Sequence, residues 1–115
     1  MTAFRSINPA TGVVLATYRP MSPHEVRRII EEAHHAFAAW RTTSIASRAS
    51  VMQTSARLLR RQAEDAGRLM AQEMGKPVTQ GRAEVEKCAW VCDYYAEHAE
   101  RFLAPEPAPT DASSS

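Results

Sequence analysis

Hydrophobic residues recur at two different spacings along the chain, and the change in spacing separates strands from helices. Two short runs, Phe4 to Ile7 and Val13 to Arg19, are rich in β-branched and aromatic residues, which is typical of strands. The segment between them, Asn8 to Gly12, begins with the Asn-Pro pair of a type I turn and ends in a glycine able to adopt a left-handed conformation. The pattern predicts a β-hairpin over residues 4–19, within an N-terminal unit of residues 1–21. Because an isolated hairpin is marginal in water, we expect it to lie against another element.

After the hairpin the apolar spacing becomes helical, and capping signals predict a first helix over residues 23–40. Ser22 is placed to cap this helix, Pro23 suits its first position, and Glu25 completes a capping box. The apolar positions of one predicted face are Val26, Ile29, Ile30, Ala33, Phe37 and Trp40.

A second helix is predicted over residues 45–74, with Ser44 as its cap and with Gly75 and Pro77 as its stop signal. Its apolar residues are spaced alternately three and four apart, which is the narrow seam typical of helices that pack along each other. The seam consists of Ala49, Met52, Ala56, Leu59, Ala63, Ala66 and Met70.

A third helix is predicted over residues 79–103, with Thr79 as its cap. Trp90, Val91 and Tyr94 widen its apolar surface to more than half of the circumference, and such a helix is usually covered on two sides. We therefore expect this helix to need a partner surface. Its other apolar positions include Val85, Cys88, Ala89, Cys92, Tyr95, Ala96, Ala99 and Phe102.

These elements predict a mainly α-helical fold with an N-terminal β-hairpin. The three helices form a segment of residues 22–104. Residues 105–115 are rich in Pro, Ala, Ser and Thr and lack periodicity, so we expect an irregular tail. The ending Ser113 to Ser115 is interpreted as a truncation point.

Composition narrows the class of protein without giving a function. The chain has 115 residues, of which 44% are hydrophobic, and a formal net charge of +1. Its length suits one domain, and its near-neutral charge argues against partnership with nucleic acid or an anionic membrane. No apolar stretch approaches the ~18 residues of a spanning helix. With only two cysteines, a reducing cytoplasm is the expected location. The excess of Arg over Lys is interpreted as the mark of a GC-rich bacterial genome.

The chemically reactive side chains show no pattern of an active site. Cys88 and Cys92 are four residues apart, so a disulfide between them is unfavourable, and no further ligand stands at a recognised metal-site spacing. Both are interpreted as small core residues. The histidines have no partner pattern of a catalytic triad, and the arginines of the second predicted helix are interpreted as a solvent-exposed face. Those residues are His24, His34, His35 and His98, and Arg57, Arg60, Arg61 and Arg68.

Several motifs, in order, resemble the N-terminal region of NAD(P)-dependent aldehyde dehydrogenases. The turn Ile7 to Gly12 resembles the family's N-terminal hairpin, and Glu73 to Pro77 resembles its E-x-G-K-P signature. The runs Ala83 to Cys88 and Cys92 to His98 resemble the succinate-semialdehyde dehydrogenase branch. The resemblance covers residues 6–105 but only about the first quarter of a typical member.

The resemblance implies a fold in which the three helices pack on the α/β dinucleotide-binding domain of a full-length enzyme. That enzyme would oxidise succinate semialdehyde to succinate with NAD or NADP. The family's cysteine nucleophile, glutamate base and oxyanion-hole asparagine belong to motifs that do not occur in these 115 residues. We therefore expect no catalytic and no cofactor-binding residue here, and no dehydrogenase activity from this chain alone.

The resemblance also implies two pairs of site residues. The Ile7 carbonyl and the Glu73 carboxylate match positions that ligate a structural monovalent cation, although Glu73 equally fits a role in capping or solvating the helix end. Glu84 and Lys87 match positions that border the substrate-access tunnel, with a solvated helix face as the alternative. The expected partners are the remainder of the dehydrogenase polypeptide and, for the full-length protein, further copies of it.

A stand-alone helical module remains the alternative function. On that interpretation the broad apolar surface of the third predicted helix docks a partner protein, and the likeness to the enzyme reflects ancestry alone.

Overall fold

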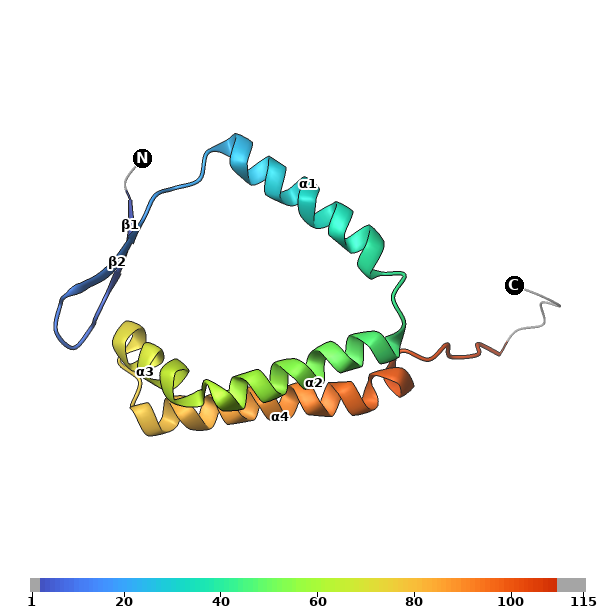
Figure 1. Cartoon of the computed structure of the whole chain (residues 1–115). Helices are drawn as coiled ribbons and strands as arrows, with labels where there is room; N and C mark the ends of the chain where they lie inside the picture. Colours follow the sequence, from blue (N-terminus) through green and yellow to red (C-terminus); the bar gives the residue numbers. More distant parts are fainter. Residues whose placement is uncertain (1–2, 110–115) are drawn as a thin grey trace.

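A computed structural model describes residues 3–109 as a two-stranded hairpin followed by four helices (Figure 1). Strands β1 and β2 pair in antiparallel orientation. This confirms the prediction of a mainly helical fold with an N-terminal hairpin, with one helix more than expected. The elements are β1 (Phe4–Ile7), β2 (Val14–Tyr18), α1 (Pro23–Trp40), α2 (Ile45–Arg61), α3 (Ala63–Met74) and α4 (Val78–Phe102).

The hairpin loop is held by the backbone and side chain of Asn8. Its N–H donates to the carbonyl of Val13 at 2.9 Å, and its carbonyl accepts from the N–H of Gly12 at 2.8 Å. Its side-chain Oδ1 accepts from the N–H of Ala10 at 2.9 Å. Gly12 has φ of +73°, a conformation that residues with a Cβ rarely adopt. The expected left-handed glycine before the second strand is therefore confirmed.

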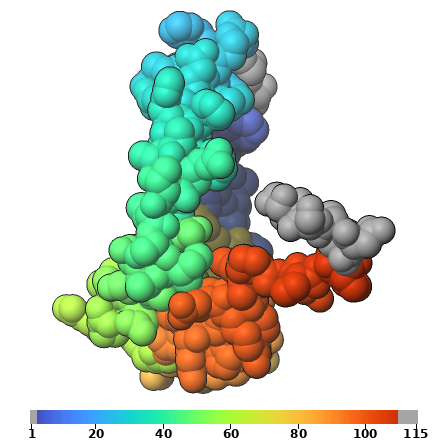
Figure 2. Space-filling model, turned by 90° about the vertical axis from the view of Figure 1, so that its right-hand side faces the viewer, coloured from blue at the N-terminus to red at the C-terminus, as the bar shows by residue number. Residues whose placement is uncertain are grey.

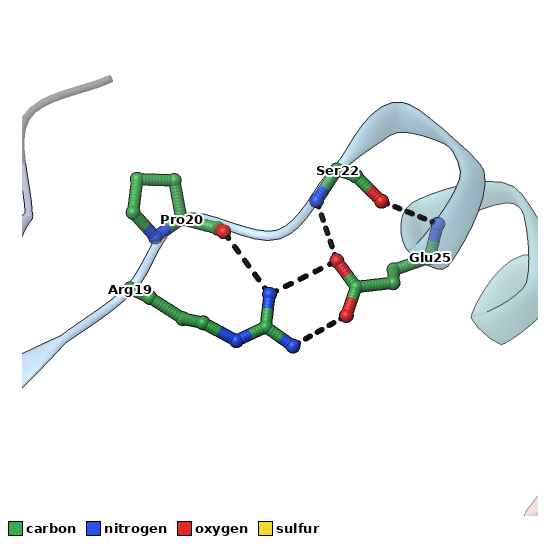
Figure 3. Close-up of polar contacts among 4 residues, drawn as sticks. All are labelled: Arg19, Pro20, Ser22 and Glu25. Atoms are coloured by element: carbon green, nitrogen blue, oxygen red, sulfur yellow. Dashed lines mark hydrogen bonds and ion pairs between the residues drawn. The ribbon is translucent and has the colours of Figure 1, made fainter.

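Helix α1 starts in the predicted capping box, which an arginine extends (Figure 3). The Glu25 N–H donates to Ser22 Oγ at 3.2 Å, and the Ser22 N–H donates to Glu25 Oε2 at 2.7 Å. Arg19 donates to both oxygens of the same carboxylate, at 2.5 and 3.1 Å. The Arg19 guanidinium and the Ser22 N–H lower the pKa of Glu25 to about 2. These contacts link the end of the hairpin to the first turn of α1.

Helix α1 is amphipathic, but its apolar face has no partner among the described residues. Figures 1 and 2 show it reaching from the hairpin to the start of α2 without packing along another helix. None of its residues is buried, and Ile30 and Phe37 are 62% and 56% exposed. The radius of gyration of the chain is 20.6 Å, against about 13 Å for a compact domain of about 100 residues. The fold is therefore open on the side of α1.

The packed part of the molecule is the pairing of α2 and α3 with α4. The predicted seam is confirmed, because all seven of its residues are buried or half-buried. Ala56 on α2 and Ala89 on α4 are fully buried. Small side chains at these positions allow the helix axes to approach closely. The resulting core is narrow and consists mainly of alanine, glycine and one valine, Val85.

The single helix predicted over residues 45–74 is wrong in one respect, because the chain breaks at Gln62 into α2 and α3. Gln62 has φ of −103° and ψ of 8°, outside the helical range. Basic residues occupy the last turn of α2, and the acidic pair Glu64 and Asp65 occupies the first turn of α3. Each set of charges stabilises the helix end beside it through the helix dipole. The seam continues across the break, which is why the apolar spacing alone predicted one helix.

Two glycines set the close approach of α3 to α4. A Cβ on Gly81 would lie 3.0 Å from both the Cα and the carbonyl oxygen of Gly67. Real Cβ atoms are very rarely found so close to backbone atoms. Arg82 donates to Glu64 at 3.2 Å beside this contact and links the same two helices.

The predicted cap of the last helix is also wrong. Helix α4 starts at Val78, after Pro77, and no side chain caps it, so Thr79 lies inside its first turn. Pro77 ends the link from α3 with an extended conformation, and this backbone geometry starts the helix without a hydroxyl cap. Residues 105–109 form no helix or strand, and residues 110–115, with the interpreted truncation point, lie outside the described part.

The apolar surface of α4 is only partly covered, as the sequence predicts. Trp90 is 59% exposed and Phe102 is 50% exposed, while Val91 and Tyr94 are half-buried. None of the helices within residues 3–109 is long and apolar enough to span a bilayer.

Candidate functional site

The hairpin meets the end of α3 at the residues expected to bind a cation. Ser6 Oγ donates to Glu73 Oε1 at 2.8 Å, which brings the Glu73 carboxylate to the residue next to Ile7. Gly75, which ends α3 with φ of +69°, faces Pro9, since a Cβ there would lie 3.2 Å from the proline ring. The contact joins residues 67 positions apart, and Ser6 is a partner that the sequence did not indicate.

The donor set at this junction is incomplete for a cation. Within residues 3–109 no three His, Cys, Asp or Glu side chains gather closely enough to hold a metal ion. One oxygen of Glu73 already accepts from Ser6. The Ile7 carbonyl is the only other ligand that the resemblance predicts here. Hard cations usually take six or more oxygens. The described residues alone therefore do not form a cation site.

The second pair, Glu84 and Lys87, lines a shallow groove on one face of α4. The face is mostly apolar between these two charged residues. The complete lining is Ala83, Glu84, Lys87, Cys88, Val91 and Cys92. The Glu84 carboxylate forms an ion pair with Lys76 from the link between α3 and α4, a partner that the sequence did not indicate. Within the described part of the chain Lys87 forms no ion pair.

Ion pairs between α2 and α4 show which way this groove faces. Arg60 on α2 donates to Asp93 on α4 at 2.7 Å and lies 3.6 Å from Glu86. Both acidic residues lie on the α2-facing side of α4, so the groove turns away from α2. These pairs are half-exposed and each contributes at most about 1 kcal/mol. They add to the packing of the buried residues of α4, which holds the helix in this rotation.

The described residues form no nucleophile–base pair. Cys88 and Cys92 are free thiols, and no hydrogen bond within residues 3–109 joins either of them to a histidine or a carboxylate. Their interpretation as small core residues is wrong, because Cys88 is exposed and Cys92 is only half-buried. The Nδ1 of His98 lies 2.8 Å from the Tyr94 carbonyl one turn earlier. The ring of His98 stacks on that of Tyr94, with 4.3 Å between the centroids, so both belong to an aromatic row along α4.

Comparison with known proteins gives a consistent result over the whole chain. The family model described as the aldehyde dehydrogenase family matches residues 1–115. An NADP(+) succinate-semialdehyde dehydrogenase of Mycobacterium tuberculosis is 45% identical over 103 residues, which are 90% of this chain and 22% of that protein. A probable NADP(+) succinate-semialdehyde dehydrogenase of Synechocystis is 40% identical over 98% of this chain and 25% of that protein.

Solved structures agree with these sequence relatives. The succinic semialdehyde dehydrogenase of Streptococcus pyogenes, solved in complex with NADP+, superimposes with a TM-score of 0.87 at 34% identity, over 95% of this chain and 24% of that one. The succinate-semialdehyde dehydrogenase of Burkholderia pseudomallei gives a TM-score of 0.85 at 29% identity, over 97% and 23%. The chain thus spans about a quarter of the length of the proteins it matches.

Proposed function

The chain belongs to the aldehyde dehydrogenase family, and we propose that it forms the N-terminal segment of an NADP-dependent succinate-semialdehyde dehydrogenase. The 45% identity to the mycobacterial NADP(+) enzyme supports this substrate and cofactor. When bound, the nicotinamide cofactor accepts the hydride released as the aldehyde is oxidised. The 115 residues lack the family's nucleophile and base motifs, so the proposed role of this segment is structural and the segment alone is inactive.

The observation that carries this proposal is the apolar face of α1, which has no partner among the described residues. A helix of this amphipathicity normally buries its apolar stripe against a core. Here Val26, Ile29 and Trp40 are 43%, 41% and 46% exposed. The relatives are about four times as long as this chain, and the additional chain in such a protein would cover the face. Homo-oligomeric assembly and a cytoplasmic location belong to the same proposal.

The two candidate site pairs have limited roles in this proposal. Ile7 and Glu73 contribute two oxygens to a structural monovalent-cation site whose other ligands lie elsewhere in the enzyme. Glu84 and Lys87 border the passage by which the aldehyde reaches the catalytic thiol. The pairing of Glu84 with Lys76 and the position of Lys87 at the edge of an apolar groove support this role.

A segment exchange tests the proposal directly. In the mycobacterial relative, the aligned 103-residue region is replaced by the corresponding part of this chain. We expect the chimera to form NADPH from succinate semialdehyde within about tenfold of the parent kcat/KM, which is about 1.4 kcal/mol of transition-state stabilisation. The 115-residue chain alone is assayed in parallel and is expected to give no aldehyde-dependent NADPH.

Two variants of the chimera test whether the α1 face is the docking surface. Ile29→Asp buries a charge if the face is covered, so we expect loss of activity or of folded protein. Arg27→Asp, on the exposed polar side of the same helix, is the matched control and should retain activity. A well-folded but inactive chimera, or a chimera that tolerates Ile29→Asp, would refute the proposal and favour the stand-alone helical module.

A further inference from the structure

The two cysteines of the chain lie in the same groove of α4. Cys88 is exposed and Cys92 is half-buried, both thiols are free, and both line the groove that also contains Lys87 and Val91. Residues four apart on a helix have Cβ atoms about 5–6 Å apart on one face. A disulfide requires Cβ atoms about 3.5–4.5 Å apart, so a bridge between these two residues within the helix is unfavourable. The groove therefore presents two thiols that are not joined by a disulfide.

We propose that Cys88 and Cys92 form a two-thiolate site for a soft monovalent metal ion of the Cu(I) class. A metal ion between two sulfurs forms two metal–sulfur bonds, and such a bond is about 2.3 Å long for zinc. The two sulfurs can therefore stand farther apart than in a disulfide, where they are bonded directly. Thiolate ligands select soft ions such as Cu(I). Binding breaks two S–H bonds, forms two Cu–S bonds and releases two protons to solvent, and no atom changes its oxidation state.

The surroundings of the dithiol favour two-coordinate Cu(I) over a tetrahedral ion. Zinc requires four ligands, and residues 3–109 contain no cluster of three metal-binding side chains. Cu(I) is stable with two thiolates in a line. The bis-thiolate complex carries one negative charge, and Lys87 lines the same groove without an ion pair among the described residues. Ala83 and Val91 make part of the groove apolar, and the one carboxylate that lines it, that of Glu84, is already paired with Lys76.

The test is a competition titration of the 115-residue chain with Cu(I), without oxygen, against a coloured Cu(I) chelator. We expect one Cu(I) to bind per chain. Once Cu(I) is bound, neither thiol should react with a thiol reagent. Cys88→Ser and Cys92→Ser should each weaken Cu(I) binding by more than about 100-fold, beyond the 10–100-fold typical of changes around a metal site.

The matched control keeps two thiols but separates them. In Cys92→Ser/Glu97→Cys the sulfurs stand nine positions apart, on opposite sides of α4, and the variant should bind as weakly as Cys92→Ser alone. Circular dichroism shows whether each variant retains its helices. Equal affinity of the control and the wild type, or a complex with one Cu(I) per two chains in sedimentation, would overturn the intrahelical site. Neither outcome bears on the proposed dehydrogenase function, which the chimera tests separately.

Discussion

The contact between Gly81 and Gly67 makes Gly81→Ala a sharp test of how α3 packs on α4. The new Cβ would lie 3.0 Å from the Cα and from the carbonyl oxygen of Gly67. Both atoms belong to the backbone of α3, so no side-chain rotation relieves the clash, and the helices must separate. Overpacking of this kind costs about 1–3 kcal/mol, and a clash with backbone lies at the upper end.

An opposing effect has to be subtracted from this cost. Alanine in a helix interior is more favourable than glycine by about 1 kcal/mol. We therefore expect Gly81→Ala to lower the free energy of unfolding by about 1–2 kcal/mol. With an m-value of about 1–2 kcal/mol per molar urea, the unfolding midpoint should fall by about 1 M.

The assay is urea unfolding followed by far-ultraviolet circular dichroism, with Gln80→Ala as the control. Gln80 is exposed on the same turn of α4, and its replacement should change stability by less than about 0.5 kcal/mol. If Gly81→Ala is as stable as the wild type or more stable, the close approach of α3 to α4 is wrong, since only the propensity gain would remain.

Two further predictions concern the start of α1 and the surface of α4. Glu25 has a pKa of about 2 in the folded chain against 4.5 for an unperturbed side chain, so its stabilisation is complete above about pH 4.5 and is lost as the pH falls through 2. Titration of its carboxyl carbon by NMR checks this, and a midpoint near 4.5 would contradict the contacts with Arg19. Trp90→Gln should reduce hydrophobic-dye binding and self-association of the isolated chain, because a tryptophan offers about 150–250 Å² of apolar contact and this one is 59% exposed. Unchanged dye fluorescence and an unchanged sedimentation profile would show that the exposed flank of α4 lies elsewhere.

The predicted cation and substrate-access residues show that a motif can indicate site residues but not their contact partners. Resemblance alone pointed to Ile7 and Glu73, and the fold places Glu73 against Ser6, the neighbour of Ile7. It did not indicate Ser6, because a contact between residues 67 positions apart has no local signature. In the same way, Lys76 reaches Glu84 only because the chain turns back at Pro77. The chemistry of a site depends on such contacts, and the spacing of residues along the chain does not predict them.

The sequence by itself determined most of the local structure of this protein, with the predicted cap at Thr79 as the exception. The caps at Ser22 and Ser44, the left-handed Gly12, the helix end at Gly75 and the apolar seam of α2 and α3 follow from interactions within a few residues, so they could be predicted. Tertiary structure decided the break at Gln62 and the separation of α1 from the α2–α4 body. The break depends on how α3 settles on α4 through backbone contact. The separation of α1 depends on which other surface its apolar face packs against. The sequence of α1 does not specify that surface.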